Sequence, residues 1–131
     1  MKAFFLFASI ALFSTSLMAC ESGEISFPQS DLCAKVEWLQ GPNYNQFNSI
    51  EISLNKESTY KLNIIPWMVM SEGHEHGSRP VKITATSSTH YIVEKIYFMG
   101  GMMGDWYLRF QLLNADNSVL EEVRTLVELA E

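Results

Sequence analysis

Soft metal ligands gather in two short segments of this 131-residue chain. Beyond residue 19, every methionine and all three histidines lie between residues 68 and 103. All of them except His90 fall within residues 67–77 and 99–106, namely Met68, Met70, His74, His76, Met99, Met102 and Met103. Thioether sulfur is a soft, neutral ligand that selects Cu(I), and imidazole also suits copper. The two segments together therefore predict a copper site, with Cu(I) favoured.

The predicted methionine ligands lie in glycine-rich segments, which are not typical of core strands, and this distinguishes them from methionines that fill a core. Methionine often fills gaps in a core, and Met68, at the end of an expected strand, fits that role as well as a metal role. We predict as ligands the side chains of Met70, His74, His76, Met99, Met102 and Met103. His90 opens another expected strand and is interpreted as structural. Carboxylates of Glu72, Glu75 or Asp105 with histidine would instead hold Zn(II), the less favoured alternative.

Two tryptophans, Trp67 and Trp106, flank the ligand-bearing segments. An indole face beside a cation adds a favourable electrostatic interaction, so both are predicted as cation–π partners or lids of the site, with a place in the core as the alternative. Methionine also suits adaptable apolar contacts. The alternative function is therefore a metal-free module that docks a membrane protein or an assembly partner through its Met/Trp-rich end.

Other classes of function find little support in the sequence. The formal net charge is −6, and no stretch collects Lys or Arg, so nucleic acid is not an expected partner. No Gly-x-Ser-x-Gly motif surrounds a serine, and Gly100-Gly101 is followed by methionine rather than by a basic residue that would meet a phosphate. We therefore expect no catalysis.

Alternation of apolar and polar residues predicts strands along most of the chain. The expected strands cover residues 34–38, 50–54, 60–64, 81–86, 91–98 and 106–112, and the third ends before Pro66. The last segment, from Val119, fits a helix face and a strand face equally. We interpret it as a strand because a sandwich needs its edge paired. The sequence thus predicts an all-β protein, an antiparallel β-sandwich of about seven strands.

The first nineteen residues have the features of an export signal, with Lys2 before an apolar run that ends at Phe13. The next residues, Leu17-Met18-Ala19-Cys20, resemble the lipobox of bacterial lipoproteins, which implies a lipid on Cys20. Ordinary signal peptidase would instead need a cut after Ser16, because Leu17 is too bulky for the −3 position. A free Cys20 would be able to form a disulfide with Cys33, stapling the N-terminal arm to the first strand.

These features predict a three-part organisation for the chain. Residues 1–19 are the signal peptide, residues 20–32 a polar tether and residues 33–131 one β-sandwich domain. The domain is expected outside the cytoplasm, facing the periplasm or the cell exterior, with the membrane contacted through the lipid anchor.

The ligand-bearing region resembles the YtkA-like and FixH-like domains of bacterial exported proteins. The resemblance covers 67–80 and 91–110, and its second element stands here as Phe98-Met99 followed by Gly104-Asp105-Trp106. The first element departs from the families' Met-Pro-x-Met, because no proline separates Met68 from Met70, and His76-Gly77-Ser78 occupies the place of Gly-His-Gly. The resemblance implies an immunoglobulin-like β-sandwich and a role in copper handling or oxidase assembly.

Overall fold

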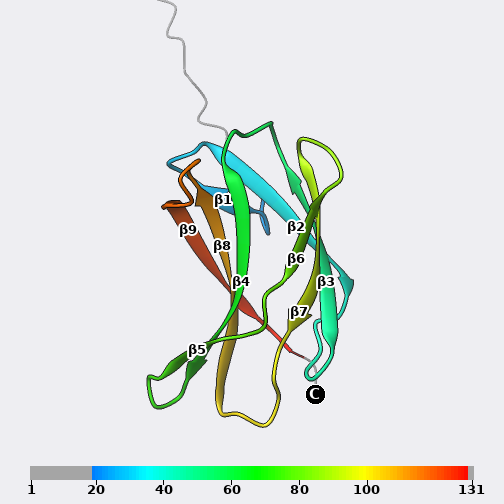
Figure 1. Cartoon of the computed structure of the whole chain (residues 1–131), viewed down its shortest axis with the longest axis vertical. Coiled ribbons are helices and arrows are strands. Elements are labelled where there is room, and N and C mark those ends of the chain that lie inside the picture. Colours follow the sequence, from blue (N-terminus) through cyan, green and yellow to red (C-terminus); the bar gives the residue numbers. More distant parts are fainter. Residues whose placement is uncertain (1–18, 130–131) are drawn as a thin grey trace, which may run out of the picture.

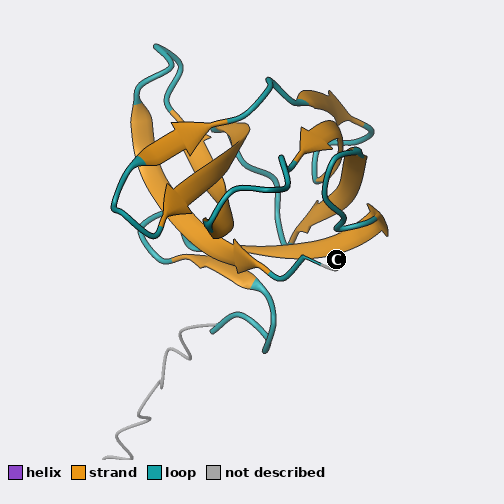
Figure 2. Ribbon diagram, turned by 90° about the horizontal axis from the view of Figure 1, so that it is seen from below, coloured by secondary structure: helices purple, strands orange, loops and turns teal. Residues whose placement is uncertain are grey.

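Two antiparallel sheets packed face to face form the molecule. A computed structural model describes residues 19–129, and Figures 1 and 2 show the two layers from perpendicular directions. The strands, in chain order, are β1 (Ile25–Phe27), β2 (Leu32–Gln40), β3 (Phe47–Leu54), β4 (Lys61–Met70), β5 (Glu75–Gly77), β6 (Lys82–Ala85), β7 (His90–Tyr97), β8 (Gly104–Leu113) and β9 (Val119–Val127). One sheet has the order β1-β2-β3-β7-β6 and the other β5-β4-β8-β9. The predicted all-β sandwich is confirmed.

Period-two alternation places the core between the sheets. In β8 the side chains of Trp106, Leu108, Phe110 and Leu112 are all buried, whereas the residues between them, except Gln111, are more exposed. In β3 the same alternation buries Ile50 and Ile52 completely. Burying each large apolar side chain contributes about 1.5–3 kcal/mol, so this alternation fixes which face of each strand points inward.

The C-terminal segment is a strand, as predicted. β9 pairs with β8 from Trp106↔Val127 to Leu113↔Val119. β4, by contrast, continues through Pro66 to Met70, so its predicted end before the proline is wrong. Proline is tolerated at a sheet edge, and β4 is an edge strand at Pro66 because β5 pairs only with Trp67, Met68 and Val69.

The segment predicted as a tether is partly folded into the domain. β1 pairs with β2 in the register Ile25↔Ala34 and Phe27↔Leu32, and Phe27 is completely buried. The tether prediction for residues 20–32 is therefore wrong over this strand, because Ile25 and Phe27 on either side of Ser26 supply a small apolar face. The predicted signal peptide lies, except for Ala19, outside the described residues. Among residues 19–129, no helix is long and apolar enough to span a bilayer.

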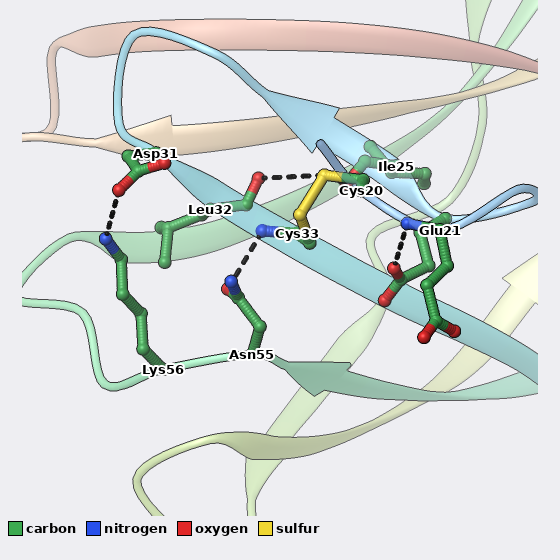
Figure 3. The surroundings of a disulfide bond; sticks show 9 residues. Cys20, Glu21, Ile25, Asp31, Leu32, Cys33, Asn55 and Lys56 are labelled. Carbon is green, nitrogen blue, oxygen red and sulfur yellow. Dashed lines mark hydrogen bonds and ion pairs between the residues drawn. A yellow bond between two sulfur atoms is a disulfide. The ribbon is translucent and has the colours of Figure 1, made fainter. Parts of the chain in front are cut away.

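Of the two arrangements left open for Cys20, the structure contains the disulfide. Cys20 is bonded to Cys33, the second residue of β2 (Figure 3). In Figure 1, β1 lies toward the upper end of the molecule, whereas β5 and the yellow loop before β8 lie at the lower end. The disulfide and the predicted metal ligands therefore occupy opposite ends of the sandwich.

Candidate functional site

Three strand ends bring the two ligand-bearing segments together. Met68 of β4 lies directly opposite His76 of β5 on one side and opposite Trp106 of β8 on the other. Directly opposed residues in an antiparallel sheet project from the same face. Met68 and Trp106 are buried in the core, so His76 stands on the same face at the sheet's edge. Met70, two residues beyond Met68, shares that face as well.

The closest approach between predicted ligands joins His76 to Met70. His76 Nε2 lies 3.1 Å from Met70 Sδ, a diagonal contact between β5 and β4. The imidazole is exposed, and the thioether is half-buried. One nitrogen and one sulfur donor from the first segment thus meet at the surface of the sheet edge.

A pocket beside this pair collects sulfur atoms from both segments. It has a volume of about 390 Å³ and is lined by Met68, His76, Gly77, Ser78, Arg79, Tyr97, Met99, Met102 and Trp106. Met68 is 1% exposed and forms the inner wall, whereas Met99 is 50% exposed at the rim. Met102 is half-buried between these extremes. The pocket therefore brings side chains of both segments together.

Trp106 and Gly104 hold the second segment against the first. Trp106 Nε1 donates a hydrogen bond to the carbonyl oxygen of Met99 at 3.2 Å, which ties the loop before β8 to the pocket wall. Gly104 pairs with Met70, and a Cβ on Gly104 would lie 2.5 Å from Val69 O and 2.8 Å from Met70 Cα. Only glycine allows the two backbones to approach this closely.

Three of the predicted ligands do not line the pocket, and of these only Met70 contacts a lining residue through its side chain, at His76. Met103 is 77% exposed and lies in a separate surface hollow beside Tyr44 and Asn45. His74 is exposed in the turn between β4 and β5, where its carbonyl oxygen accepts a hydrogen bond from the Met70 amide at 2.7 Å. The structure therefore gathers Met70, His76, Met99 and Met102 from the predicted set and separates His74 and Met103 from them.

Trp67 points to the opposite face of the sheet, away from the pocket. It pairs with Tyr107, and its Nε1 donates to Glu75 Oε1 at 3.0 Å. Arg109 already stacks on its indole ring, 4.5 Å from the centroid. The hydrogen bond from Trp67, with a second from Arg124, lowers the pKa of the Glu75 carboxyl. Trp106 is thus the tryptophan of the pocket, and Glu75 is held on the outer face.

Sequence reasoning missed part of the pocket wall. In the sequence Met68 fits a core role and a metal role equally, and in the structure it is both buried and part of the lining. The sequence indicates no role for Arg79, and it marks Ser78 only as part of the His76-Gly77-Ser78 element. Ser78 Oγ donates to the carbonyl oxygen of Tyr97 at 2.6 Å, and the Arg79 guanidinium lies 4.5 Å from the Tyr97 ring centroid. The period-two spacing of Met68 and Met70 is the sequence signal for Met68, whereas no pattern in the sequence marks Arg79 as part of the pocket wall.

The pocket is poor in hard ligands. None of its lining residues carries a carboxylate, and Arg79 is its one cationic side chain besides the titratable His76. Within residues 19–129, no three side chains among His, Cys, Asp and Glu cluster closely enough to hold an ion. The nitrogen and sulfur donors of the pocket lining are therefore one imidazole and three thioethers.

Comparison with known proteins adds no relative: no family model and no curated protein matches the chain. The resemblance to the YtkA-like and FixH-like domains consequently rests on the Phe98–Trp106 element and on the His76-Gly77-Ser78 element alone. The geometry of the pocket is the firmer basis for an inference about function.

Proposed function

We propose that this chain is an exported domain that binds Cu(I) at one end of its β-sandwich and serves in metal handling or oxidase assembly. The observation that carries the proposal is the 3.1 Å contact between His76 Nε2 and Met70 Sδ beside a pocket lined by three further methionines. His76 and Met70 are the primary ligands, and Met68, Met99 and Met102 are the thioethers available to complete the coordination.

The donor chemistry supports Cu(I) over Zn(II). Zinc sites in proteins use thiolate, imidazole and carboxylate ligands, and the pocket lining offers only one imidazole of that set. Thioethers are soft ligands that suit Cu(I). They also carry no negative charge, so the site offers little to a divalent cation that must leave its water shell. A single imidazole among methionines favours the monovalent, soft ion.

An anaerobic Cu(I) titration against a competing chelator tests the proposal. We expect one ion to bind per chain and to quench the fluorescence of Trp106, which forms a wall of the pocket. Retention of all the copper by the chelator would refute the proposal. A Trp106→Phe variant identifies the quenched indole, since Trp67 on the outer face would remain fluorescent.

Matched variants locate the ion. His76→Ala and Met70→Leu should each weaken Cu(I) binding by about tenfold or more, which corresponds to about 1.4 kcal/mol. His90→Ala is the control for the first, because His90 is an exposed histidine that begins β7 outside the pocket. Met103→Leu is the control for the second, because Met103 is 77% exposed in a separate hollow beside Tyr44 and Asn45. Equal effects of variants and controls would contradict this ligand set.

A metal-free docking module is the second candidate function, and exposed apolar side chains favour it. Phe47, Met99 and Met103 are 46%, 50% and 77% exposed around the same end of the sandwich. Methionine-rich surfaces adapt to varied partners. If this function holds, Met99→Ser should weaken the capture of a membrane-protein partner, whereas His76→Ala should leave it unchanged. The copper proposal instead expects His76→Ala to reduce the affinity for Cu(I) more than Met99→Ser does.

A further inference from the structure

The disulfide lies at the end of the sandwich opposite to the pocket, and Asn55 holds the backbone of Cys33 there through two hydrogen bonds. Its backbone amide donates to Asn55 Oδ1 at 2.9 Å, and its carbonyl oxygen accepts from the Asn55 amide at 3.0 Å. Asn55 follows directly on β3, whose other end carries Phe47 opposite Tyr97 of the pocket. Eight residues of strand put the two ends about 25 Å apart. Events at Cys20 and Cys33 are thus separate from metal binding.

A local hairpin carries Cys20 back to Cys33 (Figure 3). β1 and β2 pair with Ser26 opposite Cys33, and the Glu24 amide donates to the Glu21 carbonyl oxygen at 3.1 Å. These contacts all lie within residues 20–34, so the two sulfurs are close in sequence as well as in space. The intervening loop is too short to keep the cysteines apart once the hairpin forms.

The hairpin is also fastened to the second sheet. Glu121 at the start of β9 is 8% exposed, and its carboxylate accepts hydrogen bonds from the Gln29 amide, the Ser30 amide and Ser30 Oγ at 3.0–3.1 Å. Phe27 is completely buried beside this turn. The N-terminal arm is therefore an integral part of the domain, and only residues 21–24 separate Cys20 from the first strand.

We propose that Cys33 decides the fate of Cys20: the mature protein carries the Cys20–Cys33 disulfide and, despite the lipobox-like Leu17-Met18-Ala19-Cys20, no lipid on Cys20. Both modifications consume the same Sγ. In the first, the two thiols exchange with the disulfide of an oxidoreductase, which is reduced to its dithiol as the Cys20–Cys33 bond forms. In the second, Cys20 Sγ loses its proton and attacks the glyceryl carbon of a phospholipid. A thioether to the diacylglyceryl group forms as the bond from that carbon to the phosphate oxygen breaks, and the phosphorylated headgroup leaves with the proton. A sulfur that has followed one route is unavailable to the other.

Several contacts favour the disulfide route. Cys20 Sγ lies against the backbone between the two hairpin strands, 3.9 Å from Ile25 O and 3.8 Å from Leu32 O. A diacylglyceryl group at this sulfur would have to displace that packing, and it would leave Cys33, 7% exposed, as an enclosed unpaired thiol. The disulfide form leaves the domain without a lipid at Cys20.

Mass spectrometry of the protein tests this proposal. The full chain with its own leader is expressed in a bacterial host that has both a disulfide-forming export pathway and lipoprotein processing. The Cys20-containing peptide is then analysed with and without reduction. We expect wild-type Cys20 to be linked to Cys33, with a mass lower by two hydrogen atoms than the dithiol and without lipid. A lipid on wild-type Cys20, or two free thiols, would overturn the proposal.

The Cys33→Ser variant supplies the decisive contrast. It should convert Cys20 into a lipidated residue and move the protein into the membrane fraction. Cys20→Ser is the matched control, because it also loses the disulfide but offers no sulfur for lipid. Peptide mass reports the state of Cys20 even if a variant folds poorly. An unlipidated Cys20 in Cys33→Ser would show that Cys33 is not what withholds this residue from lipidation.

Discussion

Trp106 Nε1 donates a hydrogen bond to the carbonyl oxygen of Met99 at 3.2 Å, so the buried wall of the pocket holds the backbone of its own rim. Phe98, next to Met99, packs edge-on against the same indole at 5.4 Å between ring centroids. The ring thus fills the core, and its single N–H orients the loop that carries Met99 and Met102. Packing and loop placement are two separable tasks of this residue.

The Trp106→Phe variant distinguishes the role of this residue in core packing from its role in positioning the loop. The phenyl ring keeps much of the apolar packing, but the Met99 carbonyl loses its donor, which costs about 1 kcal/mol of stability. We expect faster hydrogen exchange over residues 99–104 and weaker Cu(I) binding. Trp67→Phe is the control, because Trp67 donates to Glu75 on the outer face and should leave exchange in this loop unchanged. Unchanged exchange in Trp106→Phe would show that the hydrogen bond does not restrain the loop.

Gly104→Ala tests the close approach of the two ligand-bearing segments. The new methyl group would meet Val69 O and Met70 Cα at 2.5 and 2.8 Å, both backbone atoms that cannot move aside alone. Overpacking of this kind costs about 1–3 kcal/mol. Chemical denaturation should show the loss of stability, and the chelator competition should show weaker Cu(I) binding because Met70 moves away from the second segment.

Gly77→Ala is the comparison for this variant. Its Cβ would meet only the Trp67 ring, at 3.5 Å, which is an ordinary van der Waals contact. We expect stability and Cu(I) affinity close to those of the wild type. A loss of stability as large as that of Gly104→Ala would indicate that any added methyl group near β5 is disruptive.

The sequence predicts the strands that support the site better than it predicts which residues line the pocket. Alternating residues from Trp106 to Leu112 identify a strand because every second side chain must be apolar to face a core. Glycine-containing segments at the ends of such strands are then expected to meet. Which loop residues enter the pocket depends on backbone contacts such as the hydrogen bond from the Ser71 amide to the Met103 carbonyl oxygen. A hydrogen bond between backbone groups does not depend on residue type and cannot be predicted from it. Met102 and Met103 therefore appear equivalent in the sequence.

Short elements are the other part that sequence reasoning misses. β1 contributes only Ile25 and Phe27 to the core, and two apolar residues are too few to establish a period. Its place depends on partners far along the chain, above all Glu121, which binds the turn at Gln29 and Ser30. The continuation of β4 through Pro66 likewise depends on its position at a sheet edge, which becomes known only when the strand order is known.

Arg79→Gln tests the charge selectivity of the pocket. Arg79 lines the pocket and stacks on Tyr97, so its positive charge opposes any cation bound there. The repulsion is about 1 kcal/mol or less per unit charge in a solvated site. Removing it should strengthen Cu(I) binding by a few-fold at most, and it should strengthen the binding of a divalent cation by about the square of that factor.

Competition assays with Cu(I) and Zn(II) on the same variant measure this ratio. Lys82→Gln is the matched control, since Lys82 is an exposed cation of β6 outside the pocket lining. Both substitutions remove one positive charge from the protein. If both metals gain affinity by the same factor in Arg79→Gln, the residue does not discriminate by charge.

Glu122→Gln tests the polar network that supports the outer face of the second sheet. Partial burial would raise the pKa of Glu122, but hydrogen bonds from Gln111 and Arg109 outweigh it and lower the pKa below its ordinary value of 4.5. Glu122 Oε1 accepts from Gln111 Nε2 at 2.7 Å and from Arg109 Nε at 2.8 Å. A carboxyl whose pKa is lower in the folded state than in the unfolded state stabilises the fold above the unfolded pKa, and this contribution is lost as the pH falls through the folded value.

We therefore expect Glu122→Gln to lower the free energy of unfolding by about 1 kcal/mol near neutral pH. The difference from the wild type should narrow as the pH is lowered through the acid range, because the wild-type carboxylate becomes protonated. Urea denaturation at a series of pH values measures both effects. Glu94→Gln, which alters an exposed carboxylate of β7, should cost little at any pH. A difference that stays constant into acid would mean that the ionised state of Glu122 is not what stabilises its network with Arg109 and Gln111.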